Sequence, residues 1–136
     1  MILLVDTCVV LDYILKREPF YKWSKLLINE IQKDKYIGIL TSKTILDIWY
    51  IVKHYTNDET KTRLIIKDIL TIFKVVDTRA IEIMMALDSD IKDYEDAVIN
   101  ESAISQLADY VITRNIKDYK NSTIKVLSPK ELLDNK

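Results

Sequence analysis

Carboxylates interrupt two apolar segments of the sequence. Asp6 directly follows the apolar run of residues 2–5, and Asp47 lies within residues 44–52, which are otherwise almost wholly apolar. Burying an unpaired carboxylate is costly, so we expect Asp47 to face a cleft or a partner. Two structural alternatives stay open. Asp6 could serve only as a helix cap, and Asp47 could lie on the surface of a helix with a wide apolar face.

A cluster of acidic residues opens the segment of residues 93–102. It contains Asp93, Glu95 and Asp96, and the spacing of Asp93 and Asp96 places them on one face of a helix. Acidic residues in a first helical turn also suit the positive end of the helix dipole. The cluster alone therefore does not establish a site.

Polar residues also follow the apolar residues 110–112. Thr113, Arg114 and Asn115 come directly after them, and Asp118 comes about one turn later. Asn115 and Asp118 taken alone are typical of turns. If four carboxylates converge, however, each pair about 4 Å apart repels by roughly 4 kcal/mol at an effective dielectric constant of 20.

Converging carboxylates must be protonated in part or neutralised by a cation. Oxygen ligands without His or Cys favour Mg²⁺ or Mn²⁺. A Mg²⁺ ion held by few carboxylates keeps several waters, can activate one of them and can polarise a phosphoryl oxygen. These residues therefore indicate a metal-dependent phosphodiesterase.

Two rare residue types and the residue at position 8 argue against other chemistry. Phosphate-binding loops, dinucleotide-binding fingerprints and nucleophile elbows need several glycines, and the chain has one, Gly38. The one histidine, His54, excludes His-rich zinc sites and paired-His catalysis. A phosphatase of the haloacid-dehalogenase type needs a second Asp two residues after the first, and Cys8 occupies that position.

Composition predicts one soluble domain over residues 1–136. Hydrophobic residues make up 49% and charged residues 30% of the chain, which suits a folded core. The net charge of −1 argues against a broad polycationic surface for nucleic acid. A single cysteine and no signal-peptide pattern favour the cytoplasm, and no apolar run approaches the ~18 residues of a membrane span.

Short apolar runs alternate with helical patterns along the chain. Strands are predicted at residues 2–5, 37–40, 74–77, 109–113 and 124–127, with helices at 7–17, 18–36, 43–56, 59–73, 79–89, 93–108 and 128–134. Thr7 and Ser42 are the expected caps of the first and third helices. This alternation predicts a parallel sheet with helices on both faces and a ligand site at the carboxyl ends of the strands.

Three segments together resemble the PIN domain family, and within it the VapC-like toxin ribonucleases. The segment LLVDTCVVLDYIL resembles the family's first strand, Asp-Thr/Ser pair and first helix, and SKTILDIWYIV resembles its second acidic motif. The segment DYEDAVINESAISQLADYVITRNIKDYKNSTIKVLSPKELL is the most specific match. The resemblance covers essentially the whole chain and implies a three-layer α/β/α sandwich with a central, mainly parallel sheet of four to five short strands.

The resemblance also implies roles for individual residues. Asp6, Asp47 and Asp96 correspond to metal-ligand or catalytic positions. Thr113 corresponds to the polar residue that supports Asp6 or its metal-bound water. Asp93 is implied as an additional acid near the metal.

Two positions depart from the family pattern. The second acidic residue is usually Glu, and Asp47 is one methylene shorter. The fourth position is often Asp, and it is occupied here by Asn115, which still offers a carbonyl oxygen. Asp118, three residues further on, could supply the missing charge through water. Asn115 and Asp118 thus complete the expected ligand set for Mg²⁺ or Mn²⁺.

The activity implied by the resemblance is hydrolysis of RNA phosphodiester bonds by metal-activated water. Arg114, Lys117 and Lys16 with its neighbour Arg17 are candidates to hold phosphate, and each could equally be solvated surface. Three tyrosines could stack an unpaired base, with packing favoured for at least two of them: Tyr13, Tyr94 and Tyr119.

Two functions remain open from the sequence. The favoured one is a ribonuclease toxin of a toxin–antitoxin pair, which by resemblance would form a homodimer and bind an antitoxin protein. The alternative is a non-catalytic PIN-like module that binds RNA or protein, with a weakened acidic site. Asn115 is the main support for this alternative.

Overall fold

Helices alternate with short strands along the chain, as the sequence predicts. The computed structural model describes residues 1–135. The strands are β1 Ile2–Val5, β2 Ile37–Thr41, β3 Lys74–Val76, β4 Tyr110–Ile112 and β5 Lys125–Leu127. The helices are α1 Thr7–Ile14, α2 Tyr21–Gln32, α3 Ser42–Thr56, α4 Glu59–Ile72, α5 Ala80–Ala86, α6 Tyr94–Ser105 and α7 Pro129–Asp134, with a 3-10 helix, η1, at Ile116–Tyr119.

All five strands pair in parallel, in the order β3-β2-β1-β4-β5. β1 is central, with β2 on one side and β4 on the other. Val5 pairs with Ile112, so the residues that follow them, Asp6 and Thr113, emerge at the same edge of the sheet. The register therefore brings together two polar residues that lie far apart in the sequence.

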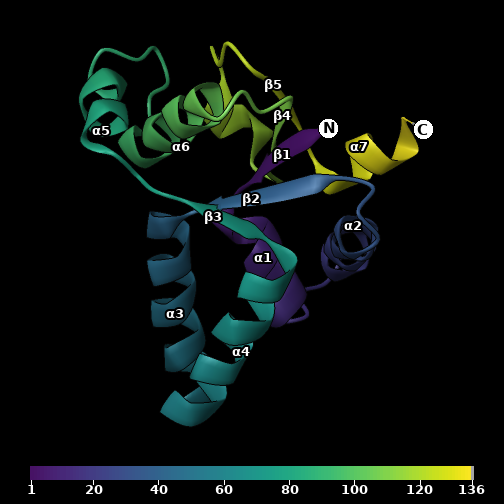
Figure 1. Ribbon diagram of the computed structural model, residues 1–136. Helices are drawn as coiled ribbons and strands as arrows, with labels where there is room; N and C mark the ends of the chain where they lie inside the picture. Colours follow the sequence, from purple (N-terminus) through teal and green to yellow (C-terminus); the bar gives the residue numbers. More distant parts are fainter. Residues whose placement is uncertain (136) are drawn as a thin grey trace.

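Helices cover both faces of the sheet, so the predicted three-layer sandwich is confirmed (Figure 1). Side chains alternate along β1 because successive residues of a strand point to opposite faces. Leu3 and Val5 pack in a core formed with residues of α1–α4 and α7, whereas Leu4 packs with residues of α5 and α6 on the other face. Both faces of β1 are thus buried, which explains its uniformly apolar sequence.

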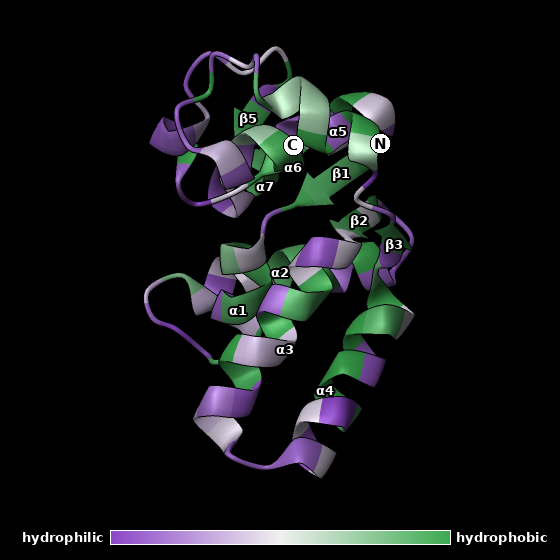
Figure 2. Ribbon diagram, turned by 90° about the vertical axis from the view of Figure 1, so that its left-hand side faces the viewer, coloured by the Kyte–Doolittle hydropathy of each residue, from purple (hydrophilic) through white to green (hydrophobic). Residues whose placement is uncertain are grey.

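Helices α3 and α4 pack against each other and extend away from the sheet (Figures 1 and 2). Asn57, in the left-handed conformation at φ 49°, ends α3, and Asp58 caps α4. No helix among residues 1–135 combines the length and apolarity needed to cross a membrane.

The caps of two helices differ from the sequence expectation by one residue. Asp6, not Thr7, caps α1, and its Oδ1 accepts a hydrogen bond of 2.8 Å from the Thr7 amide. Thr41, not Ser42, caps α3, and its hydroxyl accepts from the Thr44 amide at 3.1 Å. In both cases the helix begins directly after the strand, because the last polar side chain before the helix can satisfy an unpaired amide.

Gly38 lies where β2 passes under two apolar side chains. A Cβ at this position would lie 2.7 Å from Phe73 and 2.9 Å from Ile31. The single glycine of the chain thus serves core packing, not ligand binding.

Candidate active site

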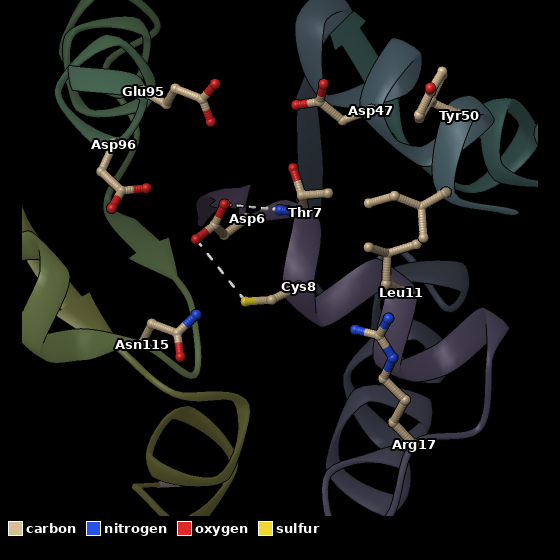
Figure 3. Close-up of a pocket in the computed structure, with 11 residues that line it drawn as sticks. Asp6, Thr7, Cys8, Leu11, Arg17, Asp47, Tyr50, Glu95, Asp96 and Asn115 are labelled. Carbon is tan, nitrogen blue, oxygen red and sulfur yellow. Dashed lines mark hydrogen bonds between the residues drawn. The ribbon is translucent and has the colours of Figure 1, made fainter. Parts of the chain in front are cut away.

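A pocket opens at the carboxyl edge of the sheet, between α1 and α3 on one side and α6 on the other (Figure 3). Its volume is about 480 Å³. Acidic side chains reach it from three elements: the end of β1, helix α3 and the first turn of α6. Its lining includes Asp6, Asp47, Glu95, Asp96 and Asn115.

Hydrogen bonds from neighbouring residues hold the Asp6 carboxylate in place. Its Oδ1 accepts from the Thr7 amide at 2.8 Å, and its Oδ2 accepts from the Thr113 hydroxyl at 2.9 Å. Thr113 is fully buried, and its oxygen also accepts a hydrogen bond from the Asn115 amide at 3.1 Å. The carboxylate therefore has a fixed orientation at the floor of the pocket.

Burial raises the pKa of Asp6 above its ordinary value, although the hydrogen bonds from Thr113 and Thr7 oppose the shift. The negative charge of Asp118 raises the pKa of Asp6 further. No ion pair to Asp6 occurs in the part of the chain that the structure describes. The carboxylate thus lacks a compensating positive charge.

The Asp96 carboxylate points toward that of Asp6 across the pocket (Figure 3). Partial burial raises the pKa of Asp96 to about 7, and repulsion from Asp6, Asp93 and Asp118 adds to the shift. Such a shift means that this part of the pocket holds more negative charge than the protein itself neutralises. A cation bound between Asp6 and Asp96 would remove that excess.

Asp47 has a positive partner. Lys43 Nζ lies 2.6 Å from Asp47 Oδ2 and 3.6 Å from Glu95 Oε1, so it connects α3 with α6. Burial alone would lower the pKa of Lys43, but Asp47 and Glu95 raise it above its ordinary value. The pocket therefore has two parts: Asp6 and Asp96, which have no basic partner among the described residues, and Asp47 and Glu95, which share the positive charge of Lys43.

Within residues 1–135, no three acidic, His or Cys side chains are arranged closely enough to surround one metal ion. The pair Asp6 and Asp96 nevertheless fits a Mg²⁺ ion, which is commonly held by one or two carboxylates and several waters. No His lines this pocket, and the raised pKa values of Asp6 and Asp96 indicate carboxylates without a compensating charge. Both features suit a hard cation.

The sequence of residues 3–117 matches the family model described as PIN domain. The chain belongs to the PIN domain family. The expected family is thus confirmed over most of the chain. A comparison with the sequences of curated proteins found no match.

Solved structures of other proteins share the fold. VapBC2 of Rickettsia felis, bound to a DNA fragment from its promoter, has a TM-score of 0.68 and 19% identity over 94% of this chain and 98% of that one. FitAcB of Neisseria gonorrhoeae has a TM-score of 0.69 and 16% identity over 96% and 99%. VapC20 of Mycobacterium tuberculosis, described as a sarcin-ricin loop cleaving toxin, has a TM-score of 0.67 and 10% identity over 90% and 98%.

Two expected ligands of this PIN domain lie outside the main pocket. Asp93 caps α6 through a hydrogen bond from the Asp96 amide at 3.0 Å. Asp118 is exposed and lines a neighbouring pocket together with Asp93 and Lys117. Both still act on the site by charge, because each raises the pKa of Asp96.

The predicted phosphate-binding residues are dispersed. Arg114 lines a separate pocket, where its Nε donates to the buried Asp12 at 2.8 Å and its guanidinium stacks on Phe20. Lys16 lies in another pocket, whereas its neighbour Arg17 lines the acidic one. The Asp12 contact gives Arg114 a structural role, and its role in binding phosphate stays a prediction.

All three tyrosines are engaged in packing or hydrogen bonding. Tyr119 is 2% exposed, so it cannot stack a base. The Tyr94 hydroxyl donates to the Ile83 carbonyl at 2.7 Å, while Tyr13 stacks on Tyr21. Burial and the charge of Asp6 raise the pKa of Cys8, which suits a packed thiol and not a nucleophile.

Sequence reasoning missed Lys43 and the role of Glu95. Lys43 precedes Asp47 by four residues, which is the spacing of an ion pair on one helix face, and this signal was available. The contact with Glu95 depends on the packing of α3 near α6, so no local pattern could have revealed it.

Proposed function

We propose that this PIN domain is an endoribonuclease that hydrolyses RNA phosphodiester bonds with the aid of a Mg²⁺ or Mn²⁺ ion. The observation that carries the proposal is the facing pair of Asp6 and Asp96, both with raised pKa values and without a basic partner among the described residues. A phosphate group alone would be repelled by this pair. A cation between them makes the pocket suitable for an RNA backbone.

Asp6 and Asp96 would hold the ion. When bound, the ion supplies an activated water and polarises the phosphoryl oxygen. Thr113 keeps the Asp6 carboxylate oriented through its 2.9 Å hydrogen bond. Asn115 lines the pocket and offers a carbonyl oxygen, whereas Asp93 and Asp118 contribute negative charge from its rim.

Asp47 and Lys43 would act on the reacting water and the RNA. Asp47 could orient a water molecule while its ion pair with Lys43 holds the carboxylate in place. Arg17 lines the same pocket and replaces Lys16 as the candidate to hold a phosphate group. Lys117 lies beside Asp118 in the neighbouring pocket, where it could contact phosphate further along the strand.

The solved structures of similar fold support a place in a toxin–antitoxin system. VapBC2 and FitAcB are such neighbours, and a further one is a toxin–antitoxin complex from Klebsiella pneumoniae. We propose that this chain is a toxin of the cytoplasm that binds an antitoxin and forms a homodimer. Large apolar side chains exposed on α3 and α5 suit protein partners: Leu46, Tyr50, Met84 and Met85.

A non-catalytic RNA- or protein-binding module is the second candidate function. Two observations favour it: Lys43 already neutralises Asp47, and the neutral Asn115 stands where the family often has Asp. In this case the pocket would bind RNA without cleaving it.

One experiment separates these functions. The protein is incubated with mixed RNA and Mg²⁺ or Mn²⁺, beside the variants Asp6→Asn and Asp96→Asn. Asp34→Asn, an exposed change away from the pocket, is the matched control. We expect cleavage by the wild type and the control and its loss in both pocket variants. Equal cleavage by Asp6→Asn would refute the site, and RNA binding without cleavage by the wild type would favour the module.

A further inference from the structure

Tyr119 carries a buried hydroxyl that has no hydrogen-bond partner in the structure. The side chain is 2% exposed, and its ring packs with Leu4, Ala97 and Val98 in the core between the sheet and α6. An unsatisfied buried hydroxyl costs about 1–3 kcal/mol, so most such groups are paired. A phenylalanine would fill the same space without this cost, so the hydroxyl calls for a functional reason.

The hydroxyl lies beside the acidic pair. Burial and the charges of Asp6 and Asp96 act on this hydroxyl. A phenol keeps its proton near neutral pH, so the group can donate. It is close enough to lower the pKa of Asp6 in turn, although the geometry of a full hydrogen bond is not reached. Carboxylates accept hydrogen bonds, so the neighbours of the hydroxyl suit a donor.

Asp6 already accepts hydrogen bonds from three donors on two segments. The Thr7 amide of α1 donates to Oδ1, the Thr113 hydroxyl after β4 donates to Oδ2, and the Cys8 thiol of α1 donates to Oδ2 over 3.9 Å. Tyr119 ends η1, so its hydroxyl would be a fourth donor, from a third segment. An ionised carboxylate offers about four acceptor sites, so a fourth donor can be accommodated.

We propose that Tyr119 is a positioning residue of the acidic site, and that its hydroxyl donates to the Asp6 carboxylate when the pocket holds a divalent cation. This inference rests on the proposed function. Partners that orient a metal-binding carboxylate commonly contribute 10–100-fold to metal affinity or activity. The Tyr119 hydroxyl would keep the Asp6 carboxylate aimed at the ion, while the buried ring fixes the position of the hydroxyl.

The test compares Tyr119→Phe with the wild type by titration with Mn²⁺, followed by the electron paramagnetic resonance of the free ion. Tyr36→Phe is the matched control, because Tyr36 is also buried, at 8% exposure, but precedes β2 at the opposite end of the sheet. We expect about a 10-fold weaker Mn²⁺ affinity in Tyr119→Phe only. The melting temperature should be unchanged or higher, since an unpaired buried hydroxyl is removed. In RNA cleavage, kcat should fall with KM for RNA unchanged.

Unchanged Mn²⁺ affinity in Tyr119→Phe would overturn this inference while leaving the proposed function intact. An equal loss of affinity in Tyr36→Phe would also overturn it, because the effect would then be a general loss of packing. A wild-type protein that binds no Mn²⁺ would overturn the proposed function and the inference together.

Discussion

Thr113 and Asp6 lie 107 positions apart in the sequence, yet the Thr113 hydroxyl donates a 2.9 Å hydrogen bond to the Asp6 carboxylate. The contact follows from the parallel pairing of β1 with β4, which ends both strands at the same edge. Because the hydroxyl also accepts from the Asn115 amide, it links two residues of the pocket. The geometry of the proposed metal site thus depends on a threonine that is itself buried.

Replacement of Thr113 tests this dependence. Thr113→Val keeps the shape of the side chain but removes the donor, so we expect RNA cleavage to fall about 10-fold or more. Thr113→Ser keeps the hydroxyl and should retain most of the activity. The measurement is kcat/KM for RNA at a fixed Mg²⁺ concentration. Full activity of Thr113→Val would show that the amide of Thr7 alone suffices to orient Asp6.

The stability of the metal-free protein should depend on the protonation of Asp96. Its pKa is raised from 3.8 to about 7 on folding, so the folded state binds the proton more tightly than the unfolded state. The resulting stabilisation is complete below about pH 4 and is lost as the pH rises through about 7. Since the carboxyl is half-exposed, we expect an effect of only about 1 kcal/mol.

Urea denaturation in EDTA between pH 4 and 8 measures this effect when the wild type is compared with Asp96→Asn. The variant should gain stability relative to the wild type as the pH increases. A difference between the two proteins that is the same at every pH would contradict the raised pKa.

Binding of Mg²⁺ should release a proton. Near pH 6.5 much of Asp96 is protonated, given its pKa of about 7, and the carboxylate must ionise to bind the ion. We expect a release approaching one proton per ion, seen by calorimetry as a binding enthalpy that depends on the ionisation enthalpy of the buffer. Asp96→Asn should show little of this dependence, and its presence there in full would point to another group.

The Arg114–Asp12 ion pair should matter for stability. Asp12 is 1% exposed, and its partners are Arg114 at 2.8 Å and Arg17 at 4.0 Å, so removing Arg114 leaves this buried charge with only the long contact. We expect Arg114→Ala to lower the free energy of unfolding by about 2–4 kcal/mol, and the double variant Asp12→Asn with Arg114→Ala to recover part of it. Urea denaturation provides the measurement. Unchanged stability with weaker RNA binding would support the phosphate-binding role expected from the sequence.

Much of the fold was predictable because local patterns determine it. The apolar runs of β1 to β5 reveal the parallel strands, and they fall within two residues of the predicted limits. Burial on both faces was predicted for all of them, but the edge strands β3 and β5 are partly exposed, because each has only one neighbouring strand. The helix caps were less predictable, since Asp6 and Thr41 compete with the adjacent Thr7 and Ser42 for the same role. Only the exact end of each strand decides between such neighbours.

The acidic residues of the site could be predicted from the sequence, but the residues that they contact could not. Asp6, Asp47 and Asp96 stand out because a carboxylate beside apolar residues requires an explanation, and all three line one pocket. The contacts of Lys43 with Glu95 and of Arg114 with Asp12 join distant segments. Tyr119 was assigned to packing or base stacking because nothing in the sequence reveals where a phenol group ends.

The uncompensated pair Asp6 and Asp96 has a kinetic consequence. An RNA strand that reaches the pocket before the cation meets net negative charge, whereas one that follows the cation is attracted. We therefore expect compulsory order, with the metal ion first and RNA second. Fluorescence anisotropy of labelled RNA at constant ionic strength would show tight binding in Mg²⁺ and weak binding in EDTA. Equal affinity in both would mean random order, so the cell's free Mg²⁺ would then not control access to the nuclease.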